Sequence, residues 1–135
     1  MQIPEHPVSG YVRVWLRLEG FFAFMLAIFV YRQQHASWLL FAFLFLAPDL
    51  SMLGYMAGSR AGAVVYNSIH SYVPPLALLA FAIVNHRSGL LPYGLIWIAH
   101  IGFDRTLGYG LKYGSNFGHT HLGWIGQQRR EGNPA

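Results

Sequence analysis

Hydrophobic positions along the chain gather in four long segments that short polar turns separate. The segments cover residues 14–31, 38–58, 61–84 and 90–107. Each segment is apolar around most of the circumference of a helix, and the second is long enough to cross a hydrocarbon core of ~30 Å. The pattern predicts an all-α integral membrane protein with four transmembrane helices, which form a single domain over residues 1–135.

A glycine- and aromatic-rich stretch follows the fourth segment. It reads GYGLKYGSNFGHTHLGW, residues 108–124. Its glycines disfavour a continuous helix, and its aromatic rings are of the kind that collect at a headgroup boundary. We predict a C-terminal cytoplasmic segment at the membrane surface and a flexible tail over about residues 126–135.

The composition agrees with a lipid environment. Hydrophobic residues make up 54% of the chain and charged residues 10%, whereas about a quarter of a soluble domain is charged. Aromatic residues (16%) and 15 glycines fit the same class, because small residues allow membrane helices to approach closely. These features favour a membrane protein over a soluble helical bundle. The absence of cysteine excludes disulfides and thiolate metal sites.

Basic residues predict the orientation of the chain. Seven basic residues lie on the side of the predicted membrane that holds both termini: Arg13, Arg17, Arg60, Arg105, Lys112, Arg129 and Arg130. Two lie on the other side, Arg32 and Arg87. Because basic loops favour the cytoplasmic side, both termini are predicted to be cytoplasmic. Nucleic acid is not expected as a partner, since the basic residues do not form one stripe.

Five ionisable residues of the four segments fall at a similar depth in this topology. They are Glu19, Asp49, His70, His100 and Asp104. A charge inside a membrane costs at least ~2.5–3.5 kcal/mol, so such groups usually face the bundle interior in pairs. His100 and Asp104 are four residues apart and project from the same helix face. We therefore predict one polar pocket, with Glu19, Asp49 and Asp104 as its candidate catalytic acids and bases.

Two prolines lie beside these polar residues. Pro48 lacks the amide that would bond the carbonyl of Leu44, and Pro74 lacks the amide that would bond the carbonyl of His70. Both helices are predicted to kink there. The freed carbonyls then need other partners, because lipid offers none.

The residue types in the pocket suit a divalent metal ion. Imidazole nitrogen and carboxylate oxygen are typical ligands of Zn²⁺, which activates water for hydrolysis when one coordination position is open. The candidate ligands are His70, His100, Asp104, Asp49 and His121. Whether His119 or His121 faces the pocket stays open.

Polar residues near the predicted pocket are candidates for binding the substrate. Arg105 and Arg17 are candidates for holding an anionic headgroup, and Asn67 lies on the polar face of the third segment. The predicted function is a metal-dependent hydrolase that acts on a lipid-like ester, amide or phosphate in the bilayer. No G-x-S-x-G nucleophile motif occurs.

Two other functions fit the same residues. Asp49, His70 and Asp104 could form a proton or ion relay, and a four-span transporter would require a homo-oligomer. In an accessory or structural subunit of a larger membrane complex, the buried polar pairs would only fix helix packing, or a lone histidine would bind a pigment or haem. A metal assay on purified protein separates these alternatives from the hydrolase.

Several stretches of the sequence resemble one protein family. They are LRLEGF at 16–21, PDLSMLGY at 48–55, YNSIHSYVPP at 66–75, WIAHIGFDRTLGYGLKY at 97–113 and THLG at 120–123. These motifs are similar to those of small bacterial membrane proteins, the domain-of-unknown-function family 4260. The resemblance implies a location in the bacterial inner membrane and no particular activity. A looser likeness, to membrane-bound metal-dependent hydrolases, rests on the PD motif, the histidines and the TH motif.

Overall fold

The structure, a computed structural model, describes residues 8, 10–114 and 118–124. The predicted tail at 126–135 lies outside these residues. The elements are α1 (Gly10–Gln33), α2 (Trp38–Phe45), the 3-10 helix η1 (Ala47–Ala57), α3 (Ser59–His70), α4 (Val73–Val84), the short 3-10 helix η2 (Ser88–Leu90), α5 (Leu91–Leu107), β1 (His119–Thr120) and β2 (Gly123–Trp124).

Most of the helical surface is apolar. Among the described residues, three stretches are long and apolar enough to cross a membrane: Gly10–Gln33, Trp38–Ala57 and Ser59–Val84. The prediction of an all-helical membrane protein is therefore confirmed, whereas the number of spans stays a prediction. The remaining helix, α5, has 17 residues, and nine of them are buried.

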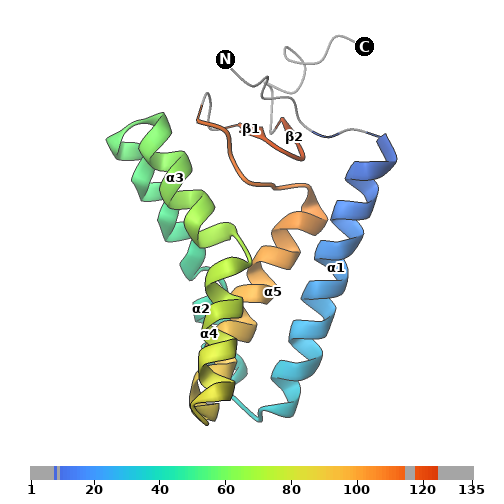
Figure 1. The fold of residues 1–135 in the computed structure, drawn as a ribbon, viewed down its shortest axis with the longest axis vertical. Coiled ribbons are helices and arrows are strands. Elements are labelled where there is room, and N and C mark those ends of the chain that lie inside the picture. The colour runs from blue at the N-terminus through green and yellow to red at the C-terminus, as the bar shows by residue number, and fades with distance from the viewer. Residues whose placement is uncertain (1–7, 9, 115–117, 125–135) are drawn as a thin grey trace.

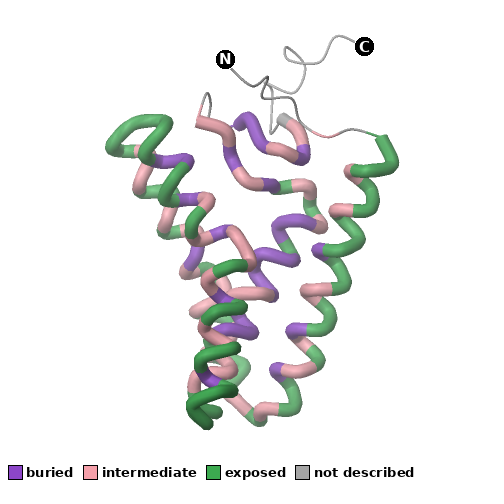
Figure 2. Tube along the Cα trace, viewed as in Figure 1, coloured by how far each residue is buried: buried purple, intermediate pink, exposed green. Residues whose placement is uncertain are grey.

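Helix α5 lies at the centre of the bundle. It contacts α1, α2 and α4, and Figure 1 shows it between α1 on one side and the α3 and α4 pair on the other. Buried residues are concentrated in α5 and in the C-terminal segment, while the outer faces of the other helices are exposed (Figure 2). The buried side chains of α5, His100 among them, are thus shielded from the surroundings of the protein.

Two glycines allow α1 and α5 to pack closely. A Cβ atom added at Gly20 would overlap the Cβ atom of Arg105, and one added at Gly102 would lie 2.6 Å from the carbonyl oxygen of Gly20. The backbones approach so closely that neither position has space for a methyl group. This contact fixes the height of α5 relative to α1, and with it the height of His100.

Replacing Gly102 with alanine is expected to destabilise the protein by about 1–3 kcal/mol, because the new methyl group would also lie 2.7 Å from the amide nitrogen of Phe24. Alanine otherwise favours helix over glycine, so the sign of the effect tests the close approach. Thermal unfolding in detergent measures the change. Gly89→Ala is the matched control, since a Cβ atom there meets nothing within 4 Å. A Gly102→Ala protein at least as stable as the wild type would contradict this packing.

The helical path changes beside both prolines. Helix α2 ends at Phe45, and the chain continues as η1, in which the amide of Asp49 donates to the carbonyl of Leu46 at 3.2 Å. Because Pro48 has no amide, this shorter hydrogen-bond pattern replaces the α-helical one. Helix α3 ends at His70, and α4 begins at Val73. The third apolar segment is thus two helices rather than one kinked helix.

The C-terminal cap, residues 108–114 and 118–124, lies over the end of the bundle where α1 begins and α5 ends (Figure 1). As predicted, it is not a continuous helix. Strands β1 and β2 pair antiparallel, and Lys112 forms a bridge with Thr120. The cap is tied to the start of α3 because Ser59 Oγ donates to the carbonyl of Gly114 at 2.9 Å. It covers the end of the bundle nearest to the polar residues.

Candidate metal centre

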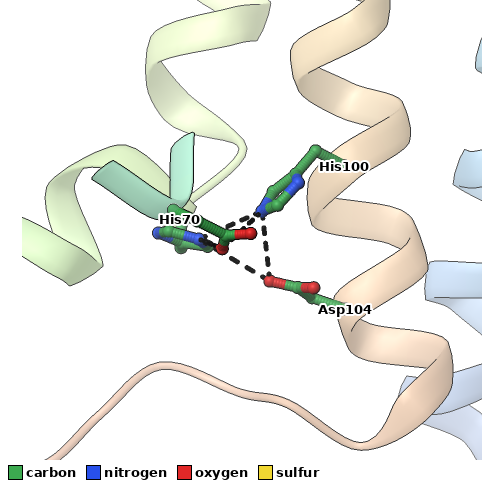
Figure 3. A group of neighbouring side chains, drawn as sticks. His70, His100 and Asp104 are labelled. Atoms are coloured by element: carbon green, nitrogen blue, oxygen red, sulfur yellow. Dashed lines mark hydrogen bonds and ion pairs between the residues drawn. The ribbon is translucent and has the colours of Figure 1, made fainter. Parts of the chain in front are cut away.

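Four side chains from three elements converge inside the bundle. Asp49 comes from η1, His70 from the last residue of α3, and His100 and Asp104 from successive turns of α5. Each offers one nitrogen or oxygen ligand atom, and these atoms all lie within 4.8 Å of one another. Figure 3 shows His70, His100 and Asp104 turned toward one another. Of the five ionisable residues predicted to lie together, these four converge.

The ligand atoms have the spacing of a small coordination shell. His70 Nε2 lies 3.2 Å from His100 Nε2, and 3.6 Å from both Asp49 Oδ1 and Asp104 Oδ2. His100 Nε2 lies 3.4 Å from Asp49 Oδ1 and 3.3 Å from Asp104 Oδ2. Atoms bonded at ~2.0–2.2 Å to a tetrahedral Zn²⁺ lie roughly 3.3–3.6 Å apart. The distances from the two histidine nitrogens to each other and to the carboxylate oxygens match this spacing.

His70 is oriented as a metal ligand by its own helix. Its Nδ1 atom lies 3.1 Å from the carbonyl oxygen of Tyr66 and 3.4 Å from Ser51 Oγ. A carbonyl can only accept, so Nδ1–H donates to it and Nε2 presents a lone pair to the other ligand atoms. The Tyr66 ring stacks on the imidazole at 3.8 Å and restricts its rotation.

Side chains of α5 donate hydrogen bonds to the backbone at the break after α3. The carbonyl of His70, which has no amide partner at Pro74, accepts from Arg105 Nη2 at 2.9 Å. The neighbouring carbonyl of Ile69 accepts from Trp97 Nε1 at 2.7 Å. Arg105 Nη1 also donates to the carbonyl of Tyr109, at 3.0 Å. Both carbonyls at the break are satisfied, and His70 is held against the face of α5 that carries His100.

Three of the four residues are largely buried, and Asp49 is partly exposed. His70 and His100 are 0% and 2% exposed, whereas the Asp49 side chain is 42% exposed and that of Asp104 is 12% exposed. Asp49 is therefore the most accessible residue of the four.

Lys112 of the C-terminal cap lies close to the same group. Its amide donates to Asn67 Oδ1 at 2.6 Å, and its carbonyl accepts from Asn67 Nδ2 at 2.7 Å. Burial lowers the pKa of the Lys112 ammonium to about 8, while the Asp104 and Asp49 carboxylates act in the opposite direction. The Lys112 side chain is thus mostly protonated at neutral pH. The two hydrogen bonds of Asn67 hold the cap against α3.

The other predicted site residues lie outside the converging group. Glu19 is exposed on α1, and Arg17 is exposed with its Nε donating to the carbonyl of Thr106 at 2.8 Å. His121 Nδ1 accepts from the amide of Leu111 at 2.9 Å. Burial and the Arg105 cation lower the pKa of His121, which leaves its ring neutral at neutral pH.

The sequence prediction did not include two residues around the group. For Lys112 the sequence predicted only a cytoplasmic position, and for Tyr66 it predicted no role. A single lysine between aromatic and glycine residues in GYGLKY was the available signal for Lys112. For Tyr66, the spacing of four residues to His70 places both rings on one helix face.

Comparison with known proteins gives one match. The family model described as Domain of unknown function (DUF4260) matches residues 13–125. This confirms the family resemblance that the motifs predicted. No curated protein and no solved structure matches the chain.

Proposed function

We propose that this chain, which belongs to the DUF4260 family of domains of unknown function, holds a divalent metal ion in the membrane and uses it for hydrolysis. The observation that carries the proposal is the spacing of the ligand atoms of Asp49, His70, His100 and Asp104, all within 4.8 Å of one another. Four electron-pair donors this close, mostly removed from water, repel one another unless a cation or protons lie between them.

The donor set favours Zn²⁺. Two imidazole nitrogens and two carboxylate oxygens suit this ion better than Mg²⁺ or Ca²⁺, which take more oxygen ligands. When bound in a site with an open position, the ion acts as a Lewis acid and lowers the pKa of water toward neutrality. The buried His70, His100 and Asp104 would then hold the ion.

Asp49 has a different role in this proposal. Its side chain is the most exposed of the four, so it is the ligand that can give way to water and accept the proton that the water loses. In the hydrolysis, the water oxygen bonds to the carbonyl carbon or phosphorus of the substrate. The bond to the leaving oxygen or nitrogen breaks, and that atom takes a proton.

Activity assays on the full chain in lipid nanodiscs test this function. With Zn²⁺ added, we expect turnover of at least one of three lipid-like substrates: a carboxylic ester, an amide and a phosphate ester. A chelator should remove the activity and Zn²⁺ should restore it. Asp49→Asn should keep the ion but lower turnover by about 10²–10⁴-fold, the usual contribution of a general base. His86→Ala, in an exposed turn, is the control. A Zn²⁺-loaded protein that is inert toward all three substrates would contradict hydrolysis and favour the structural role.

We also propose that α5 is a fourth span and that both termini are cytoplasmic in the bacterial inner membrane. In support, α1 begins and α5 ends at the same end of the bundle. Reporter fusions before residue 10 and after residue 135 are expected to report the cytoplasm at both ends. Fusions on opposite sides of the membrane would mean an odd number of spans and contradict the topology.

A further inference from the structure

We infer that the backbone carbonyl of Phe45 positions His100 as a metal ligand, and that Pro48 frees this carbonyl to do so. The inference rests on the proposed metal centre and adds a positioning group for one of its ligands. It follows from a buried ring nitrogen of His100 that has no partner, from the hydrogen-bond pattern around Pro48 and from the contact of Phe45 with His100.

The two histidines of the centre differ in what holds their rings. His70 Nδ1 donates to the carbonyl of Tyr66 at 3.1 Å, and its Nε2 faces the other ligand atoms. His100 also turns Nε2 toward those atoms, but its Nδ1 is buried and has no hydrogen-bond partner among the described residues. Figure 3 shows this second nitrogen on the side of the ring turned away from His70.

A histidine that binds an ion through Nε2 carries its ring proton on Nδ1. A buried N–H group is costly unless an acceptor lies within reach, and such an acceptor also fixes the orientation of the ring. His100 is only 2% exposed, so water does not readily serve this nitrogen. As a ligand, His100 therefore needs an acceptor from the protein on its Nδ1 side.

The carbonyl of Phe45 is placed to be that acceptor. The end of α2 packs against His100, because the Phe45 ring meets the imidazole edge to face at 5.3 Å. The Phe45 carbonyl faces the His100 ring as a hydrogen-bond acceptor, although it does not yet have the geometry of a full bond to Nδ1. Since Nε2 faces the other ligands, this carbonyl serves Nδ1, and a small rotation of the ring completes the bond.

Pro48 frees the Phe45 carbonyl from the hydrogen bonds of the helix. In an α-helix this carbonyl would accept from the amide of Asp49, but that amide donates to the carbonyl of Leu46 at 3.2 Å. In the 3-10 pattern of η1 it would accept from residue 48, which is proline and has no amide. Both helical donors are missing, and a carbonyl inside a membrane needs another donor. A proton on His100 Nδ1 meets this need.

One short segment thus serves two ligands. Phe45 ends α2, and Asp49 follows four residues later in η1. The change from α-helix to 3-10 helix at Pro48 brings the Asp49 carboxylate to the centre and leaves the Phe45 carbonyl for His100. Pro48 is therefore a positioning residue, although its own side chain has no group that can bind an ion.

Pro48→Ala tests the inference, because it supplies an amide at the position that lacks one. Calorimetric titration of Zn²⁺ into the full chain in detergent is expected to show binding about 10–100-fold weaker than in the wild type, the usual effect of losing the partner of a ligating histidine. Pro92→Ala is the matched control, since Pro92 lies in the first turn of α5, where an amide has no partner within the helix. It should leave Zn²⁺ affinity unchanged.

NMR of the Zn²⁺-loaded chain with nitrogen-15 histidine separates a positioning role from a structural one. In the wild type, the His100 Nδ1 proton is expected to resonate downfield and to exchange slowly with water, as a hydrogen-bonded proton does. In Pro48→Ala it should move upfield and exchange faster. The His70 Nδ1 proton, which the Tyr66 carbonyl binds, should stay unchanged and serves as the internal control.

Should Pro48→Ala fail to fold, the second variant carries an ester in place of the peptide bond between Phe45 and Leu46. An ester carbonyl is a weaker acceptor, so both changes are expected in the same direction. Zn²⁺ affinity equal to that of the wild type, or weaker binding with an unchanged His100 proton signal, overturns the inference and leaves the metal centre intact. A wild type that binds no Zn²⁺ overturns both.

Discussion

Replacing His100 with alanine is expected to abolish Zn²⁺ binding while the helical fold persists. His100 Nε2 lies within 3.2–3.4 Å of the other three ligand atoms, so its loss removes the ligand nearest to all of them. Even residues that only orient metal ligands change affinity by about 10–100-fold, so removal of a ligand should exceed that range. The number of Zn²⁺ ions per purified chain, with calorimetric affinity, measures the effect.

The fold should survive this substitution because the packing of α5 against α1 does not depend on the His100 ring. Its ring meets that of Phe45 edge to face at 5.3 Å, whereas the close contact of α1 with α5 depends on Gly20 and Gly102. His86→Ala is the matched control, since His86 is exposed in the turn at the other end of the bundle. Unchanged Zn²⁺ binding in the His100 variant would show that the ion binds elsewhere.

Replacing Arg105 with methionine should lower both stability and metal affinity. The buried guanidinium satisfies the carbonyls of His70 and Tyr109, at 2.9 Å and 3.0 Å. Their loss leaves two carbonyls at chain breaks without this partner, and the cost should be about 3 kcal/mol. His70 is then less firmly placed against α5, so Zn²⁺ binding should weaken as well.

Thermal unfolding and Zn²⁺ titration measure the two effects of Arg105→Met. Arg105→Lys, which can replace one hydrogen bond but not both, should be intermediate. Arg87→Met removes an exposed arginine in the turn at the other end of the bundle and should change neither quantity. A methionine variant as stable as the wild type would contradict the bracing role of Arg105.

The convergence of the four polar residues was predictable because two physical rules act on them. Helix periodicity places His100 and Asp104 on one face, and the cost of charge in lipid drives Asp49 and His70 inward at the same depth. Proline chemistry predicted a kink near Asp49 and another near His70, where the structure has a 3-10 helix and a break between two helices. These rules depend on local sequence and on depth in the membrane, which can be read without a structure.

The partners of the other polar residues were not predictable. Asn67, Arg105 and Arg17 were expected to bind substrate, but their side chains contact backbone groups of other segments. Such contacts depend on the path of the C-terminal cap and on the helix break, which no periodic pattern specifies. Lys112 reaches the centre for the same reason, because the cap crosses the end of α3.

X-ray absorption at the zinc edge of the purified, Zn²⁺-loaded chain tests the central claim most directly. The account predicts a first shell of nitrogen and oxygen atoms at ~2.0–2.2 Å, with the outer-shell scattering of two imidazole rings. That scattering should be absent from any residual zinc signal of the His70→Ala, His100→Ala double variant. A chain that retains no zinc, or a zinc shell without imidazole scattering, would contradict a metal centre built from Asp49, His70, His100 and Asp104.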